Sequence, residues 1–216
     1  MRRVTGRNFF EKLLSITIRV ITRLLYHLLT CYTKLMETMS QIADAQRIDE
    51  SIEALATHII SDSSDQKPIF VALLRGAAPF ASKLMFAITR QAPKFHPEID
   101  YMMVSTYGNE RSAGKPQIVT DLAPSTDVTE RTVVVLDDVL DKGITADFVI
   151  KHLTTMGAKH VKLAVLADKQ TKRLVPIEAD YACLNVKDVW LVGMGMDDSA
   201  TQKEAYRWQD SIYQVN

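Results

Sequence analysis

The segment "VVVLDDVLDKGIT", residues 133–145, carries the most informative pattern in this chain. Its first part is an apolar run rich in valine, and β-branched residues in such a run are typical of a buried strand. Two adjacent acids, Asp137 and Asp138, close the run, and Asp141 follows three positions later. Because like charges repel and carboxylates are costly to desolvate, this arrangement predicts a bound ligand that compensates the three acids.

The composition limits the class of protein. A chain of 216 residues with 47% hydrophobic and 24% charged residues can bury one globular domain, and it is neither disordered nor fibrous. The net charge is zero, so we expect no nucleic-acid partner. Cys31 and Cys183 have no Cys-x-x-Cys or Cys/His spacing around them, which argues against a disulfide framework or a metal cluster. We therefore expect a cytoplasmic protein.

The charge is uneven along the chain, because residues 1–38 carry a net charge of +5 and the remainder balances it. Between residues 12 and 34 polar residues recur at steps of three or four, and aliphatic residues fill the opposite face. This pattern predicts a basic amphipathic helix. Arg19 and Arg23 interrupt its middle, which favours a helix that lies on a membrane surface over one that spans the bilayer.

Three interpretations of residues 1–38 stay open. The segment is an extension absent from the native product, with Met36 or Met39 as the true start; it contacts a membrane through residues 12–34; or it serves targeting or another docking role. In each case we expect a boundary after residue 38 and a second domain over residues 39–216.

Strands and helices alternate in this second domain. Continuous apolar strands that alternate with helices favour an α/β fold with a parallel sheet covered on both faces, and ligands of such sheets bind at the carboxyl ends of the strands. Residues 108–126 are polar and carry Gly and Pro, so they predict a mobile loop or flexible hairpin of the kind that forms a lid. The expected helices are 49–60, about 77–90 and 145–156; the expected strands are 68–74, 98–108, 132–136, 160–167, 180–185 and 189–193.

The end of the opening segment has the chemistry of a phosphate site. A loop that enters a helix at Gly143, Ile144 and Thr145 presents unpaired backbone N–H groups and a hydroxyl to an anion. The neighbouring pair Asp137 and Asp138 can accept hydrogen bonds from sugar hydroxyls or bind a divalent cation. A phosphorylated ribose with Mg²⁺ satisfies both halves, whereas the simpler alternative is that the acids only cap the helix.

The opening segment resembles the 5-phosphoribose-binding signature of the type I phosphoribosyltransferases. That signature is a hydrophobic strand, two acids, two apolar residues, Asp, a variable residue, Gly, a variable residue and Thr. Further segments, between about residues 49 and 210, are similar in order to the hypoxanthine-guanine phosphoribosyltransferases: "LLRGAAPF" (73–80) to their pyrophosphate loop, "STYG" (105–108) to the start of their lid, "LADKQTKR" (166–173) to their purine-contacting lysine segment, and "DVWLVGMGMD" (188–197) to their aromatic-apolar-Val-Gly segment.

The resemblance implies a parallel-sheet core with a small hood and a mobile lid loop, preceded here by the amphipathic helix. It implies purine salvage, in which the enzyme transfers the 5-phosphoribosyl group of phosphoribosyl pyrophosphate to N9 of hypoxanthine or guanine and releases pyrophosphate. Mg²⁺ would be the cofactor, and a homodimer or homotetramer the assembly.

The resemblance also implies a role for each matching residue. Asp141 would handle the proton on purine N7 as a base, Lys169 would donate to the 6-oxo group and Trp190 would stack on the purine. Metal would be held by Asp137, Asp138 and Asp197. The residues that would bind phosphoribosyl pyrophosphate are Arg75, Gly76, Thr106, Tyr107, Asp137, Asp138, Lys142, Gly143, Ile144 and Thr145, and Leu191 would offer its backbone to the base edge.

The chain departs from the family pattern at three positions. Arg75 replaces the usual lysine, and Lys142 replaces a common threonine. The pyrophosphate-binding arginine of the family corresponds to either Lys203 or Arg207, and the sequence leaves both open.

Three other functions stay open from the sequence. The enzyme could prefer xanthine, although Lys169 favours any 6-oxopurine over adenine because an ammonium group donates and cannot accept. A non-catalytic regulator that senses phosphoribosyl pyrophosphate would need no acid-base residue such as Asp141. A receiver-like signalling domain also has an acidic pair at a strand end, but there the pair follows the first strand, and here it follows about the third.

Overall fold

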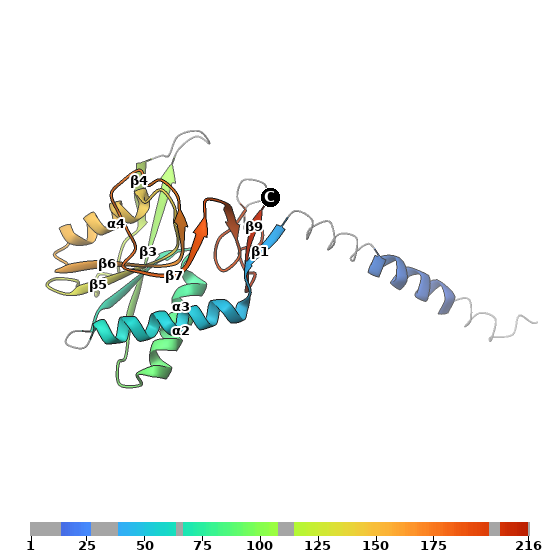
Figure 1. Ribbon diagram of the computed structural model, residues 1–216, viewed down its shortest axis with the longest axis horizontal. Helices are drawn as coiled ribbons and strands as arrows, with labels where there is room; N and C mark the ends of the chain where they lie inside the picture. Colours follow the sequence, from blue (N-terminus) through green and yellow to red (C-terminus); the bar gives the residue numbers. More distant parts are fainter. Residues whose placement is uncertain (1–13, 27–38, 64–66, 108–114, 199–203, 216) are drawn as a thin grey trace, which may run out of the picture. The chain divides into compact units, whose positions relative to one another are not determined.

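The computed structural model describes residues 14–26, 39–63, 67–107, 115–198 and 204–215 (Figure 1). The chain divides into two compact units, Met1–Ser40 with Asn216, and Gln41–Val215.

In the first unit, residues 14–26 form a helix. Its large aliphatic side chains, among them Ile16, Ile18 and Leu25, are at least half exposed. The predicted amphipathic helix is thus observed over these residues, and the rest of the 12–34 segment lies outside the described part. No helix in the described ranges has the length and hydropathy needed to cross a bilayer.

A six-stranded sheet forms the centre of the second unit, in the order β4-β3-β2-β5-β6-β7 (Figure 1). Neighbouring strands are parallel throughout except for β4, which runs antiparallel to β3 at one edge. This confirms the predicted α/β class. The strands are β2 (Ile69–Leu74), β3 (Glu98–Tyr107), β4 (Lys115–Thr120), β5 (Thr132–Leu140), β6 (His160–Gln170) and β7 (Tyr181–Lys187).

Helices cover both faces of this sheet. Helices α2 (Ala45–Asp62) and α3 (Ala78–Gln91) pack on one face, and α4 (Ile144–Thr155) packs on the other. Successive residues of β5 serve the two cores in turn, because side chains of a strand alternate between its faces. Val134 faces the core under α2 and α3, whereas Val135 faces the core under α4. This explains the unbroken valine run of the sequence.

A second, three-stranded sheet has the order β1-β9-β8, with β1 at Met39–Ala43, β8 at Trp190–Val192 and β9 at Ile212–Val215. Strands β8 and β9 are antiparallel. This small sheet corresponds to the hood that the family resemblance implies, and it carries Trp190 and Leu191.

Helix α2 is longer than the expected 49–60, and strands β1 and β9 were not expected. Three further differences from the sequence prediction lie close to the cavity or the lid segment. Strand β5 continues to Leu140, so Asp137 and Asp138 lie within the strand and not after it. Strand β6 continues to Gln170 and therefore includes Lys169. Part of the expected 108–126 loop is the edge strand β4, which agrees with the hairpin alternative. Both extensions have a neighbouring parallel strand as hydrogen-bond partner, which overrides the weak strand propensity of the charged residues.

Candidate active site

A cavity of about 480 Å³ lies where the carboxyl ends of β2, β5 and β6 meet the strand β8. Most of the residues singled out from the sequence line it. They are Gly76, Asp137, Asp138, Asp141, Lys142, Gly143, Ile144, Thr145, Lys169, Trp190, Leu191 and Asp197, together with Arg207.

Asp137 and Asp138 form a desolvated acidic pair on β5. Loss of solvent raises the pKa of Asp137 well above its ordinary value, and repulsion from Asp138 raises it further. Desolvation also raises the pKa of Asp138, against hydrogen bonds that lower it. The Asp138 carboxylate lies against Gly76, where an added Cβ would come within 2.0 Å of Oδ2. Any side chain at position 76 would therefore displace this acid.

This donor set fits Mg²⁺ in part. Mg²⁺ accepts carboxylate oxygens and usually completes its shell with water and substrate phosphates, so an all-protein cage is not needed. Desolvation raises the pKa of both carboxyl groups, and a bound cation would favour their ionised forms. No group of three or more potential metal-ligating side chains is gathered within the described ranges. Asp197 lines the same cavity, and its carboxylate pairs with Arg207 at 2.7 Å.

The turn from β5 into α4 depends on Gly143. This residue has φ +85°, a left-handed conformation that favours glycine, and a Cβ here would lie 2.4 Å from Cγ2 of Ile177. Helix α4 begins at the next residue, Ile144, without a side-chain cap. The first N–H groups of a helix have no partner within it, so this turn presents donors to an anion at the cavity wall.

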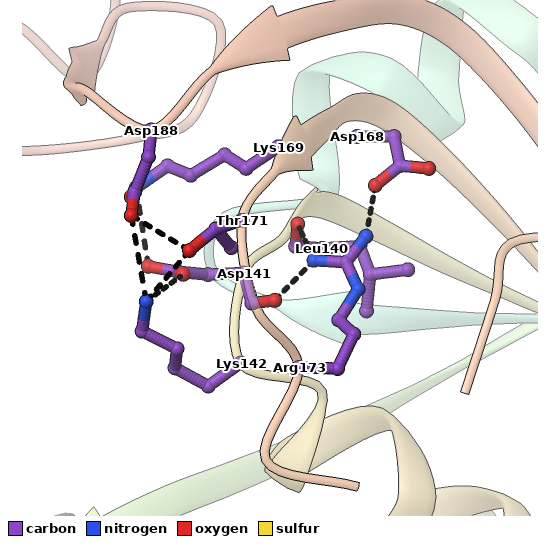
Figure 2. Close-up of polar contacts among 8 residues, drawn as sticks. All are labelled: Leu140, Asp141, Lys142, Asp168, Lys169, Thr171, Arg173 and Asp188. Atoms are coloured by element: carbon purple, nitrogen blue, oxygen red, sulfur yellow. Dashed lines mark hydrogen bonds and ion pairs between the residues drawn. The ribbon is translucent and has the colours of Figure 1, made fainter. Parts of the chain in front are cut away.

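Asp141 lies between two ammonium groups, as Figure 2 shows. Nζ of Lys169 donates to Oδ2 of Asp141 at 3.1 Å, and Lys169 itself is 8% exposed. Nζ of Lys142 is 3.6 Å from the other oxygen, Oδ1, which has no hydrogen-bond partner. The carboxylate is therefore charge-compensated, and its Oδ1 is buried without a hydrogen bond.

The side chain of Lys142 is directed away from the turn that it precedes (Figure 2). Its ammonium group donates to Oγ1 of Thr171 at 2.9 Å and lies 3.6 Å from Oδ2 of Asp188. Thr171 in turn donates to Asp188 at 2.6 Å. The ammonium group of Lys142 thus lies near Asp141, the partner of Lys169. The sequence analysis did not identify its other two partners, Thr171 and Asp188.

A second cavity of about 360 Å³ adjoins the first at Leu74, Asp197 and Arg207. Arg75 lines it, and its Nη1 donates to Oε1 of Glu204. Arg207 is more deeply buried, and its Nε donates to the other oxygen of Glu204 at 2.5 Å. Two residues were candidates for the position of the family's pyrophosphate-binding arginine. Arg207 lines both cavities, and Lys203 lies outside the described residues.

The remaining predicted residues come from two strands. Trp190 is 48% exposed at the cavity and Leu191 is buried, both on β8. Thr106 and Tyr107 end β3, where their backbones pair with Pro116 and Lys115 of β4. Their side chains lie outside the described part of the structure.

Comparison with known proteins agrees with this arrangement. Residues 38–199 match the model of the phosphoribosyl transferase domain. The chain belongs to the phosphoribosyltransferase family. This phosphoribosyltransferase is 33% identical over 144 residues to a hypoxanthine-guanine phosphoribosyltransferase of Streptococcus pyogenes, covering 66% of this chain and 76% of the relative.

Two further relatives carry the same name. The hypoxanthine-guanine phosphoribosyltransferase of Bacillus subtilis is 31% identical over 153 residues, which covers 70% of this phosphoribosyltransferase and 81% of the relative. The crystal structure of a hypoxanthine-guanine phosphoribosyltransferase from Bacillus anthracis superposes with a TM-score of 0.71 at 27% identity, over 82% of this chain and 98% of that one. These matches confirm the family resemblance and the fold that the sequence predicts.

Proposed function

We propose that this phosphoribosyltransferase is an enzyme of purine salvage that transfers the 5-phosphoribosyl group of phosphoribosyl pyrophosphate to N9 of hypoxanthine or guanine. The products are the purine nucleoside 5′-monophosphate and pyrophosphate. The observation that carries the proposal is the meeting of an acidic pair, a phosphate-binding turn and the Asp141–Lys169 pair around one cavity. The names of the relatives support the same reaction.

The turn at Gly143 and the start of α4 would bind the 5-phosphate through backbone N–H groups and the Thr145 hydroxyl. Asp137 and Asp138 would accept hydrogen bonds from the ribose hydroxyls. As the bond at the anomeric carbon breaks, positive charge develops on the ribose, and these carboxylates stabilise it.

Mg²⁺ is the proposed cofactor, with Asp137 and Asp138 at one site and Asp197 at a second. When bound, it would neutralise charge on the pyrophosphate leaving group. Arg75 and Arg207 would bind the same leaving group through their guanidinium groups, since both line the cavity next to the acidic pair. Thr106 and Tyr107 would belong to the lid over this substrate.

The purine would occupy the side of the cavity that Lys169 and Trp190 line. The Lys169 ammonium would donate to the 6-oxo group, and the Trp190 indole would stack on the ring. Leu191 would offer its backbone to the base edge. The carboxylate of Asp141, whose Oδ1 accepts no hydrogen bond, would take the proton that N7 loses as N9 becomes glycosylated.

The proposal extends to the context of the enzyme. We place it in the cytoplasm as a homodimer or homotetramer, with residues 39–216 as the catalytic domain and residues 1–38 as a separable extension. The family match, which begins at residue 38, supports this boundary. Membrane contact through the 12–34 segment is a proposal that rests on the exposed aliphatic residues of the helix over 14–26.

A substrate panel tests the function. Purified protein with Mg²⁺ and phosphoribosyl pyrophosphate is offered hypoxanthine, guanine, xanthine or adenine, and nucleotide formation is followed by absorbance. We expect turnover with hypoxanthine or guanine and little with adenine. Xanthine as the best substrate would support the xanthine-preferring alternative. Binding of phosphoribosyl pyrophosphate without turnover of any base would instead support a regulator.

A further inference from the structure

The guanidinium group of Arg173 lies between Leu140, at the end of β5, and Asp168 of β6 (Figure 2). Its Nη1 donates to the backbone carbonyl of Leu140 at 2.8 Å and also to that of Asp141. Its Nη2 pairs with the carboxylate of Asp168 on β6. The Arg173 and Asp168 side chains are each 18% exposed, and Arg173 lines neither cavity described above.

The residues that follow Arg173 continue this support. The backbone N–H of Leu174 donates to the carbonyl of Lys142 at 3.0 Å. Val175 and Ile177 pack so closely on Gly143 that a Cβ on this glycine would lie within 3.0 Å of either side chain. Residues 173–177, the bracing segment, thus satisfy three successive carbonyls and cover the glycine that begins the turn.

The bonds of Arg173 suit a guanidinium group specifically. Leu140 ends strand β5 and Asp141 follows it, so their carbonyls need donors where the backbone leaves the sheet. A guanidinium group presents several N–H donors in a rigid plane and stays charged, so one side chain can hold two carbonyls and a carboxylate together. A lysine could hold the charge but would not reproduce this planar set of donors.

We propose that Arg173 is a positioning residue for 5-phosphate binding. By holding the carbonyls of Leu140 and Asp141 outward, it fixes the backbone that presents the N–H groups of the turn to the phosphate. Its ion pair with Asp168 ties this backbone to β6 immediately before Lys169. The inference rests on the proposed function, and it adds a residue that acts through the backbone without touching the substrate.

Calorimetric binding without turnover tests this role. Ribose 5-phosphate probes the turn, and Mg²⁺-pyrophosphate probes the neighbouring half of the site. We expect Arg173→Met to weaken ribose 5-phosphate binding roughly 10- to 100-fold, the scale of hydrogen bonds to a charged group, and to leave pyrophosphate binding nearly unchanged. Arg131→Met is the matched control. Arg131 pairs with Glu98 at 2.8 Å and lines neither cavity, so its loss should change neither ribose 5-phosphate binding nor pyrophosphate binding.

A second variant separates positioning from general stability. Arg173→Ala leaves space for added guanidinium ion at millimolar concentration, which should restore part of the ribose 5-phosphate affinity, whereas Arg173→Met fills the space and should not respond. Should Arg173→Met fail to fold, Asp168→Asn keeps the arginine and should still weaken ribose 5-phosphate binding, by a smaller factor.

The outcomes distinguish this inference from the proposed function. Equal ribose 5-phosphate binding by the wild-type protein and Arg173→Met would overturn the role of Arg173 alone. Equal weakening of ribose 5-phosphate and pyrophosphate, with no guanidinium response, would also overturn it, because that pattern indicates a general structural role. No binding of phosphoribosyl pyrophosphate or ribose 5-phosphate to the wild-type protein would overturn the proposed function and this inference together.

Discussion

The ammonium group of Lys169 lies 3.1 Å from Oδ2 of Asp141, and the other carboxylate oxygen has no hydrogen-bond partner. Lys169 thus holds the acid by one oxygen, and the second oxygen lies 3.6 Å from Nζ of Lys142. For a purine that binds beside Lys169, this arrangement puts the ammonium group that donates to the 6-oxo group next to the carboxylate that accepts the proton from N7. Mutation of Asp141 or Lys169 therefore tests the proposed purine-binding and proton-accepting roles directly.

Asp141→Asn should lower kcat about 100-fold or more, the usual scale for the loss of a positioned acid-base group. Asparagine has nearly the same shape, so phosphoribosyl pyrophosphate affinity and the melting temperature should change little. Asp147→Asn is the matched control. Asp147 pairs with Lys151 one turn further along helix α4, and its loss should leave kcat unchanged. A near-normal kcat in Asp141→Asn would remove this residue from the mechanism.

Asp137→Asn/Asp138→Asn should weaken Mg²⁺-dependent binding of phosphoribosyl pyrophosphate without lowering stability. Desolvation raises the pKa of both carboxyl groups, so their ionised forms are disfavoured in the folded state, and neutral amides relieve this cost. The melting temperature at neutral pH should therefore stay equal or rise. A large fall in melting temperature with unchanged substrate affinity would show that the pair is structural.

Glu204→Gln should lower KM for phosphoribosyl pyrophosphate by a few-fold, the scale of one partly exposed ion pair. The Glu204 carboxylate forms ion pairs with both Arg75 and Arg207, the two side chains proposed to bind pyrophosphate, so it would compete with this substrate group. Removing its charge takes one ion pair from each arginine, although Arg207 keeps its ion pair with Asp197. Glu178→Gln at an exposed position is the control. A higher KM in Glu204→Gln would mean that Glu204 orients Arg207 and does not compete with the substrate.

The central strands and the phosphate turn could be predicted because their signals are local. The valine run of β5 and the Gly143 turn depend on neighbouring residues, and both are where the pattern predicts them. The extension of β5 through Asp137 could not be predicted, because it depends on pairing with β6 up to Leu140 and Asp168.

Other features were missed because they depend on contacts distant in sequence. Strand β4 contains Pro116 and lies at the sheet edge beside β3, so the sequence predicted residues 108–126 as a loop or hairpin and did not locate the strand. Arg75 donates a hydrogen bond to Glu204, which lies 129 positions later in the sequence, and a contact between such distant residues cannot be predicted from the periodicity of the sequence. Arg173 stood inside a recognised segment, but its role is evident only from the carbonyls that it contacts.

The Cys183 thiol should react slowly in the folded protein. Burial raises its pKa from 9.0 to about 12, so at pH values below 9 almost no thiolate is present. Because the folded pKa is above the unfolded one, burial of the neutral thiol stabilises the fold below about pH 9 and this contribution is lost as the pH rises toward 12. In a Cys31→Ser background, iodoacetamide should label the native protein far more slowly than the unfolded one. Equal labelling rates would contradict the burial of this thiol.

Removal of residues 1–35 should leave kcat/KM unchanged. Every proposed substrate-binding or catalytic residue lies at or after Arg75, and a chain that starts at Met36 keeps the whole of β1, which begins at Met39. The full-length protein should co-sediment with anionic vesicles, because the helix over residues 14–26 combines exposed aliphatic side chains with Arg19 and Arg23, whereas the shortened chain should not.

A full-length variant with Ile18→Asp and Leu25→Asp separates the amphipathic face from chain length. Both side chains are more than half exposed, so the substitutions should abolish vesicle binding and leave turnover unchanged. Vesicle binding that persists in this variant would assign the effect to basic charge alone. Loss of turnover on truncation would have a different meaning: residues 1–35 would then support the catalytic domain or its oligomer interface, and the domain boundary proposed after residue 38 would be wrong.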